Sequence, residues 1–520
     1  MVSQHGILLA ISIISDHFGP LVSKVCGCLL RHGPLSLSDI IRRLQLSSGQ
    51  VKNSLLVLIQ HNCVQAYSTP RGKPVCETLA WRGDKTVTLY LAIFDNVLHR
   101  MRFSKFLSLV RVDIPESEDL LEGLLQNGRL TFDQLVGRTK TKAPEGSPAP
   151  TREEIRANFN KLVCAHYVER CPRPEPFFDP LADEQPISTR KRAHKAVEIV
   201  LSLEQKILRT AALSDAERFS EIPYVMEGSS NANEHDNHAV AGGKRKHEDL
   251  EVDEADSIIA ENEVLWRTNF EKFIFCLKKK FCAERKKAKL KLSTHVIWEA
   301  FFEANVTNND NKTVTSPING ILERVGQKEG GTSMTLDQII SVLNDLECIS
   351  TTRNPEDFTF AFLEYCYLNK LVEACRNDEV ESLVKKKHGQ EAYTIFRLLL
   401  KQGCPVETDD ITDRTILDKQ IVHETLYKLW KDEFIDSERV PYVSGTGGSQ
   451  FFVWRVKNTY REQFIDYLYH TALNLRHMIN NLAELLLEGT KDEIKLRNRK
   501  NFLVLVLTRH DESLMLFHDF

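Results

Sequence analysis

Apolar and polar positions follow two different periods between residues 383 and 456. Helical steps of three and four residues run through a long predicted helix, at Ile421, Val422, Leu426, Leu429 and Trp430. After a glycine-rich turn at residues 445–448, apolar residues return at 451–454 in the manner of a β-hairpin. Helices followed by a two-stranded wing predict a winged helix, which is a variant of the helix-turn-helix.

The N-terminal part of the chain repeats this pattern. Gly19 and Gly33 are as far apart in sequence as Gly389 and Gly403. Beyond the glycines, apolar residues stay in register at one constant offset, at Ile40, Val51, Leu55, Leu58 and Val64 and at Ile411, Val422, Leu426, Leu429 and Ile435. This many matches in register indicate an internal repeat.

Two further copies are interrupted by insertions. One has Gly128 and Leu135 at the spacing of Gly33 and Ile40, then a loop at 139–150, and then the apolar residues Ile155, Phe159, Leu162 and Val168. The weaker copy has a helical pattern at 336–344, followed by Phe358, Phe362, Tyr365 and Leu371. The repeat therefore predicts four modules.

These patterns predict a mainly α-helical chain with small β-wings: four tandem extended winged-helix domains followed by a C-terminal coiled-coil helical hairpin. An additional helix precedes each winged helix, as at residues 7–19 in the first module and 87–106 in the second. The predicted winged helices occupy residues 1–83, 84–176, 258–378 and 379–457, with a linker at 177–257 and the hairpin at 458–520. The linker is expected to hold a helix within 188–219 and a disordered charged segment at 227–256. A short basic cluster in that segment, 244–247, fits either a nuclear import signal or a solvated linker.

The hairpin supplies the candidate contacts with partner proteins. Its first helix carries an apolar seam at Phe464, Leu468, Leu475, Met478, Leu482 and Leu485. The seam is shorter than a free coiled-coil dimer needs, so a hairpin within a larger assembly is the better interpretation.

Candidate DNA contacts are cationic and amide side chains on the predicted recognition helices and wings. In the first module they are Arg42, Arg43, Lys52, Asn53, Arg71 and Lys73, and in the fourth they are Lys419, His423 and Arg439. Cations beside DNA displace counterions from the phosphates. For any single residue a solvated surface is the simpler explanation, but their combination on a helix and a wing favours a phosphate-binding patch.

The densest basic segment lies in the helix that leads the third predicted module. Its candidate contact residues are Lys278, Lys279, Lys280, Arg285, Lys286 and Lys287. Nucleic acid, an acidic face of a neighbouring protein and a solvated helix packed by phenylalanines are all compatible with this pattern.

Composition narrows the functional classes. The 520 residues carry a formal net charge of −4, so any nucleic-acid contact must come from local patches. No apolar stretch is long enough to cross a bilayer, so no membrane contact is expected. The 12 cysteines include no C-x-x-C pair, and we expect reduced core thiols and no metal. Phosphate-binding and hydrolase motifs are absent from the sequence, so we expect neither cofactor nor catalysis.

The order of these parts resembles a known family. The segment from Val380 to Val384 and on through residues 395–400 is similar to the fourth extended winged helix of the large winged-helix subunits of RNA polymerase III. The resemblance runs over nearly the whole chain. The related α-subunit of general transcription factor IIE differs, because its family adds a zinc ribbon. The resemblance implies a nuclear, non-catalytic subunit that forms a heterotrimer with two smaller partners beside the polymerase clamp. Such subunits help initiation factors to recruit the enzyme and to open promoter DNA at tRNA, 5S rRNA and other small RNA genes.

Two other classes of protein remain as alternatives. A scaffold subunit of the proteasome-lid kind ends in one winged helix after an array of paired helices, whereas here the copies run from end to end. A free sequence-specific transcription factor would need a dense arginine and asparagine face for reading base edges.

Overall fold

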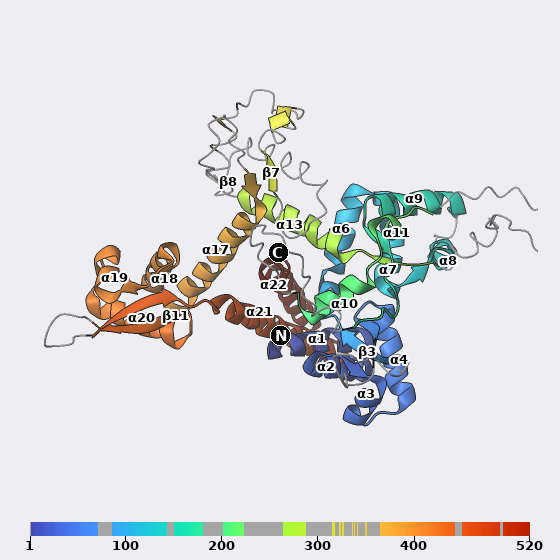
Figure 1. The fold of residues 1–520 in the computed structure, drawn as a ribbon, viewed down its shortest axis with the longest axis horizontal. Coiled ribbons are helices and arrows are strands. Elements are labelled where there is room, and N and C mark those ends of the chain that lie inside the picture. Colours follow the sequence, from blue (N-terminus) through green and yellow to red (C-terminus); the bar gives the residue numbers. More distant parts are fainter. Residues whose placement is uncertain are drawn as a thin grey trace, which may run out of the picture. The chain divides into compact units, whose positions relative to one another are not determined.

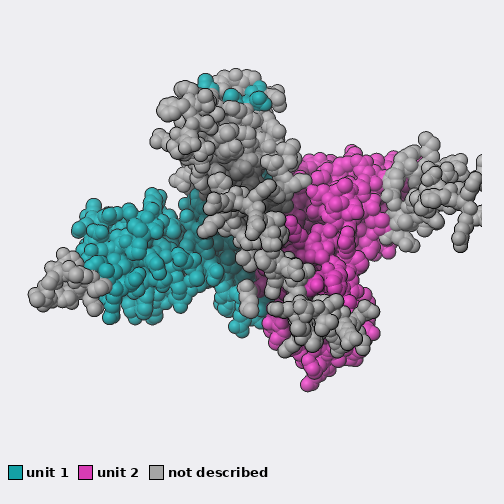
Figure 2. Space-filling model, in the orientation of Figure 1, with its two compact units in different colours: residues 1, 3–9, 274–520 teal, residues 2, 10–273 magenta. Residues whose placement is uncertain are grey.

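The computed structural model describes residues 2–70, 86–142, 150–179, 201–222, 264–287, 365–441, 450–488 and 492–520. It also describes a few short pieces between residues 315 and 350. The chain is mainly helical and forms two compact units (Figures 1 and 2). The first unit in chain order, magenta in Figure 2 and labelled unit 2 there, is made largely of residues 10–273, and the second, teal and labelled unit 1, of residues 3–9 and 274–520.

The first unit begins with helices packed on a small sheet. Its elements are α1 (Gln4–Phe18), of which residues 10–18 belong to this unit, α2 (Pro20–His32), β1 (Leu35–Ser36), α3 (Leu37–Leu44), α4 (Ser48–Gln60), β2 (Val64–Pro70) and β3 (Thr86–Ala92). The antiparallel sheet has the order β1-β3-β2, with Val64 paired to Ala92 and Pro70 to Thr86. Residues 87–92 were expected to begin a helix running to Phe106, and that prediction is wrong, because they form the strand that closes this sheet.

The second sheet of this unit is assembled from distant parts of the sequence. After α5 (Phe94–His99) and α6 (Phe103–Asp113) come α7 (Glu118–Asn127), β4 (Leu130–Thr131), α8 (Phe132–Lys142), α9 (Arg152–Cys164) and β5 (Val168–Arg170). The central strand is β6 (Leu265–Thr268), so the order is β4-β6-β5. Strand β6 was predicted to belong to the third module and instead completes the second. The linker therefore lies between two strands of one sheet.

Two short helices are all that is described of the predicted linker helix at 188–219. They are α10 (Leu203–Ala211) and α11 (Asp215–Arg218). Ile207 of α10 is fully buried beside Tyr67 and Leu91, so this segment packs on the first sheet.

The second unit contains two further small sheets. The first of these, β7-β9-β8, joins β7 (Thr315–Pro317), β9 (Tyr365–Tyr367) and β8 (Ile349–Ser350). The register of the third repeat aligns Tyr365 with Leu58 and Leu371 with Val64, and so predicts Tyr365 in a helix and Leu371 in a strand. This prediction is wrong, because Tyr365 lies in a strand and Leu371 in helix α17 (Leu368–His388). Phe358 and Phe362 lie outside the described residues.

The last sheet follows the plan of the first. Helices α18 (Gln390–Gln402), α19 (Thr408–Thr415) and α20 (Lys419–Lys431) accompany β10 (Val406–Glu407), β11 (Ile435–Pro441) and β12 (Gln450–Val456), in the order β10-β12-β11. Val422, Leu426 and Leu429 of α20 are fully buried, as are their counterparts Val51 and Leu58 in α4. The predicted glycine-rich wing tip lies outside the described residues.

Backbone details repeat with the side chains. Gln45, between α3 and α4, and Ile416, between α19 and α20, both adopt left-handed φ values, 54° and 56°. Asn62 and Glu433 do the same just after the long helix, with φ values of 59° and 61°. Few non-glycine residues adopt this conformation, so its recurrence at equivalent positions supports the internal repeat.

Two long helices end the chain. Helices α21 (Tyr460–Leu487) and α22 (Glu493–His518) lie side by side (Figure 1). Phe464 packs on Phe517 with ring centroids 4.5 Å apart, and Leu514 and Leu516 are fully buried. The two helices form the expected hairpin.

Candidate nucleic-acid interface

Helix α4, which packs against the first sheet, provides the best-formed candidate surface for nucleic acid. Ser47 caps its start: its hydroxyl oxygen accepts a hydrogen bond from the Gln50 backbone N–H, and the Ser47 backbone N–H donates one to the side-chain Oε1 of Gln50. This reciprocal capping satisfies two of the N–H groups that a helix start leaves without partners. Val51, Leu55 and Leu58 then turn one face into the core.

The outer side of α4 carries the predicted contact residues. Lys52 and Asn53 are both exposed because they lie opposite the buried face. On the preceding helix, Arg42 is paired with Asp39 at 2.6 Å, whereas Arg43 is exposed. Arg43 and Lys52 form no ion pair with any residue that the structure describes. Their charges are therefore available to a ligand.

The first wing contributes strands β2 and β3, which run towards the predicted turn. Arg71 and Lys73 lie in that turn, outside the described residues. Their part in the interface stays a prediction.

The cations of the fourth module are differently placed. Lys419 is 2.7 Å from the carboxylate of Asp409, and Arg439 lies over the ring of Phe452, 5.2 Å from its centroid. His423 is exposed on α20, about one helical turn before Tyr427 and two before Trp430, which are also exposed. This surface does not reproduce the free cations of the first module.

The basic helix α13 (Phe270–Lys287) uses part of its charge inside the chain. Lys278 is buried and donates a hydrogen bond from Nζ to the carbonyl oxygen of Phe520 at 3.0 Å. Phe281 packs on the Phe520 ring at 5.7 Å. Lys278 is thus a structural residue and not a DNA contact as predicted. Lys279 is half-buried and Lys280 is exposed, while the side chains of Arg285, Lys286 and Lys287 lie outside the described part of the helix.

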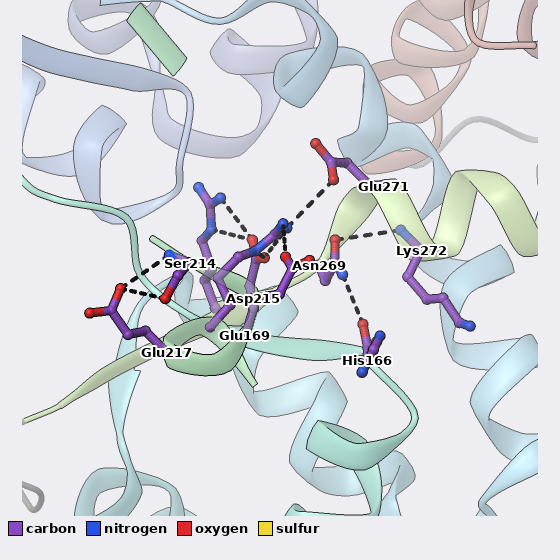
Figure 3. A network of polar contacts seen from close by, with 10 residues as sticks. His166, Glu169, Ser214, Asp215, Glu217, Asn269, Glu271 and Lys272 are labelled. Atoms are coloured by element: carbon purple, nitrogen blue, oxygen red, sulfur yellow. Dashed lines mark hydrogen bonds and ion pairs between the residues drawn. The ribbon is translucent and has the colours of Figure 1, made fainter. Parts of the chain in front are cut away.

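A buried ionic network stabilises the second sheet (Figure 3). Glu169 of β5, with 3% of its side chain exposed, accepts hydrogen bonds from Arg267 of β6 at 2.8 Å and Arg218 of α11 at 2.8 Å. On the neighbouring turn, Asn269 donates to the carbonyl oxygen of His166 at 2.9 Å. The network ties the linker helix α11 to both strands. Sequence reasoning missed it because the three charged residues are far apart in sequence and follow no motif.

A cluster of aromatic and cationic side chains lies at the C-terminal end of helix α4. The His61 ring stacks near Phe18 with centroids 4.5 Å apart, and the Arg100 guanidinium lies 4.5 Å from the same Phe18 ring. Burial first, and then the charges of Arg100 and His17, lower the pKa of His61 to about 4. His61 is therefore neutral at physiological pH, and this cluster adds no cation to the interface.

The predicted partner seam lies partly inside the chain. Phe464, Leu468 and Leu482 are buried, and Phe464 packs on α22. Leu475 is half-buried, whereas Met478 and Leu485 are 52% and 40% exposed. Half of the seam is therefore buried within the chain, and its exposed residues Met478 and Leu485 remain candidates for partner contact.

The described residues contain neither a metal-ligand cluster nor a helix that could span a membrane. Across those residues, no cluster of histidine, cysteine and carboxylate side chains is arranged to hold a metal ion. None of the helices described is both long enough and apolar enough to span a bilayer.

Comparison with known proteins identifies the family. Residues 8–69 match the family model for the RNA polymerase III subunit RPC82 helix-turn-helix domain, and residues 157–357 match the model for RNA polymerase III subunit RPC82. The helix-turn-helix match includes α3, α4 and the exposed Lys52. Both models describe the same subunit.

Whole-chain relatives agree with the family models. The chain is 23% identical over 460 residues to DNA-directed RNA polymerase III subunit RPC3 of Bos taurus, covering 87% of this chain and 79% of the relative. The RPC3 subunit of Homo sapiens is 22% identical over 461 residues, with the same coverage. The rpc3 subunit of Dictyostelium discoideum is 32% identical over 184 residues, which cover 33% of this chain and 27% of the relative. These relatives are named as polymerase subunits, in agreement with the prediction that this chain is not itself an enzyme. The chain belongs to the family of RNA polymerase III subunits described as RPC82 and RPC3.

Proposed function

We propose that the chain is a nuclear subunit of RNA polymerase III that helps to recruit the enzyme to promoters and to open DNA at tRNA, 5S rRNA and other small RNA genes. The observation that carries the DNA-contacting role is the pair of exposed, unpaired cations, Arg43 and Lys52, on the helix-turn-helix segment. Such cations hold phosphates without reading sequence. This suits a subunit that serves many promoters.

The proposed architecture is four tandem extended winged helices and a C-terminal coiled-coil hairpin. Four three-stranded antiparallel sheets, each with its last strand in the centre, support it. So do the left-handed residues at equivalent turns of the first and last modules. In this plan β6 belongs to the second module, and the linker becomes an insertion in its wing.

The proposed partners are the two smaller subunits of a heterotrimer, the polymerase clamp, the initiation factors and promoter DNA. One acidic chain with small basic patches binds DNA weakly by itself. Within an assembly, several weak contacts on one scaffold add through effective concentration. Exposed apolar residues of the hairpin, such as Met478 and Leu485, are candidates for the protein contacts.

Depletion and add-back test this role. Removing the protein from a nuclear extract with an antibody is expected to abolish transcription of tRNA and 5S rRNA templates, while a messenger-type promoter continues to be transcribed. Polymerase purified with the chain should restore activity, and polymerase stripped of the chain should elongate from a pre-melted template without initiating on a duplex promoter. Full duplex initiation by the stripped enzyme would contradict the proposal.

A further inference from the structure

Helix α20 exposes two aromatic side chains on the face where α4 exposes Lys52 and Leu56. Tyr427 is 59% exposed and Trp430 is 46% exposed, with ring centroids 6.0 Å apart. Lys419, His423, Tyr427 and Trp430 follow one another at helical steps of four, four and three residues, so they form one stripe along the helix. Ile421 on the flank of α20 is 42% exposed. Exposed aromatic residues grouped in this way mark interaction surfaces.

The turn before α20 exposes a further apolar residue, which is held in an unfavourable backbone conformation. Ile416 ends α19 in the left-handed conformation, at φ 56° and ψ 33°, and 92% of it is exposed. A β-branched residue is strongly disfavoured there, and the equivalent turn of the first module carries Gln45. An isoleucine held in an unfavourable conformation and turned to solvent stabilises nothing inside the module. Strain of this kind is typical of binding sites.

The net charge of α19 and α20 disfavours DNA as the ligand of this surface. Between residues 407 and 431 the acidic residues Glu407, Asp409, Asp410, Asp413, Asp418 and Glu424 outnumber the basic residues Arg414, Lys419, Lys428 and Lys431. Lys419 is moreover paired with Asp409. In the equivalent stretch of the first module, residues 36–60, the basic residues Arg42, Arg43 and Lys52 outnumber the single acidic residue Asp39. Phosphates would be repelled from the fourth module and attracted to the first.

We infer that the outer surface of α19 and α20, which exposes Ile416, Tyr427 and Trp430 and carries more carboxylates than cations, binds a basic amphipathic segment of a partner protein. Apolar side chains of that segment pack against the two aromatic rings, and its lysines or arginines face Asp410, Asp413 and Glu424. Tyrosine and tryptophan dominate the binding energy of protein interfaces, and complementary charge at the border selects the partner. The first and fourth modules thus divide the work, one facing DNA and the other protein.

A binding assay on the full-length chain tests the chemistry of this surface. The probes are a fluorescent helical peptide of leucine and lysine at i, i+3, i+4 spacing, the same peptide with glutamate in place of lysine, and a 20-base-pair DNA duplex. The lysine peptide is expected to bind, and Tyr427→Ala with Trp430→Ala to weaken it about tenfold or more. Asp410→Asn with Asp413→Asn should weaken it less and flatten its salt dependence.

The matched control is Leu56→Ala, because Leu56 occupies the position in α4 that Tyr427 occupies in α20 and is 64% exposed. This variant is expected to leave peptide binding within about twofold. Undiminished peptide binding by the Tyr427 and Trp430 variant, or equal binding of the glutamate peptide, would overturn the inference. Loss of duplex binding in that variant, with peptide binding intact, would assign the surface to DNA.

Photo-crosslinking in the assembled polymerase separates this inference from the proposed function. Tyr427→p-benzoylphenylalanine should crosslink to a basic segment of a neighbouring protein, identified by peptide mapping, whereas Leu56→p-benzoylphenylalanine should crosslink to promoter DNA. A DNA crosslink from position 427, or none while position 56 reacts, rejects the docking surface alone. A protein crosslink from 427 with none to DNA from 56 rejects the DNA-contacting role of the first module alone.

Discussion

At the scale of single residues, burial separates the positions that hold the modules together from those available to ligands. Hydrophobic spacing alone grouped Ile421 and Trp430 with Val422, Leu426 and Leu429 on one helix face. Val422, Leu426 and Leu429 are fully buried, whereas Ile421 and Trp430 are about half exposed. Periodicity locates a helix and its core but cannot tell an apolar residue at the edge of the buried face from one kept for a partner.

Truncating a core residue of α20 tests its structural importance. Leu426 is fully buried, so Leu426→Ala should lower the free energy of unfolding of this module by roughly 2–5 kcal/mol through lost contacts and a residual cavity. Hydrogen exchange of α18 and α20 measures the change. The neighbouring exposed residue provides the control, and Tyr427→Ala should shift it little. Equal protection in the Leu426 variant would show that the core is not where the repeat places it.

His61 gives the first unit a specific response to pH. Its pKa in the fold, about 4, lies below its ordinary value of 6.5, so the unfolded chain binds a proton that the folded chain resists. Stability from this group is present above pH 6.5 and is lost as the pH falls from 6.5 towards 4. The variant His61→Phe keeps a ring against Phe18 but cannot titrate. Thermal unfolding at pH 7 and pH 5 should show a smaller loss for this variant than for the wild type, and an equal loss would contradict the assignment.

At the scale of secondary-structure elements, local patterns are the most predictable part. Helix spans and the first and last repeats follow from glycine spacing and apolar steps, since both depend on neighbouring residues. Strand β6 could not be found in this way, because its partners β4 and β5 lie beyond the long linker and its four residues carry no distinctive pattern. The Glu169 network was missed for the same reason, since its charged residues are also far apart in sequence.

Removing the Glu169 carboxylate should release the linker helix α11. Glu169→Ala leaves Arg218 and Arg267 without their shared partner, and loss of a buried ion pair costs roughly 3 kcal/mol. Hydrogen exchange of residues 203–218 is expected to rise sharply. Asp215→Ala is the matched control, because Asp215 is largely exposed and lies 3.6 Å from Arg218. Unchanged exchange in the Glu169 variant would indicate that other contacts hold α11.

The candidate DNA surface on α3 and α4 makes a quantitative prediction about salt. In the assembled polymerase, Arg43→Gln with Lys52→Gln should reduce the slope of log affinity against log salt by about two units, because each lost phosphate contact removes about one. Lys24→Gln, which removes an exposed charge from α2, is the control. A slope equal to that of the wild type would assign α4 to protein contact.

At the scale of the whole molecule, the order of parts carried the family assignment, because the individual motifs are weak. The sequence-based candidates were less successful: Lys278 is buried, Lys419 is paired and half of the hairpin seam faces inward. Which charged residue finds an internal partner depends on tertiary contacts that spacing does not encode. The division between a cationic first module and an aromatic, acidic fourth module emerged only with the structure.

Deleting the hairpin, residues 460–520, should prevent assembly with the polymerase while the first unit remains folded. Helices α21 and α22 pack chiefly on each other and on α17, and they expose apolar side chains such as Phe502 and Leu505. Co-purification measures assembly, and the circular dichroism of the truncated chain controls for folding. Normal recovery of the complex would show that the hairpin is dispensable.

The most direct test of the account is promoter opening by polymerase that carries Arg43→Gln and Lys52→Gln. Permanganate reactivity of unpaired thymines on a tRNA promoter reports opening, and subunit stoichiometry reports assembly. We predict unchanged assembly and slower opening, with the deficit relative to the wild type largest at low salt and shrinking as salt is raised, because the wild type has more phosphate contacts to lose. Wild-type opening at every salt concentration would contradict a DNA-contacting role for the first recognition helix.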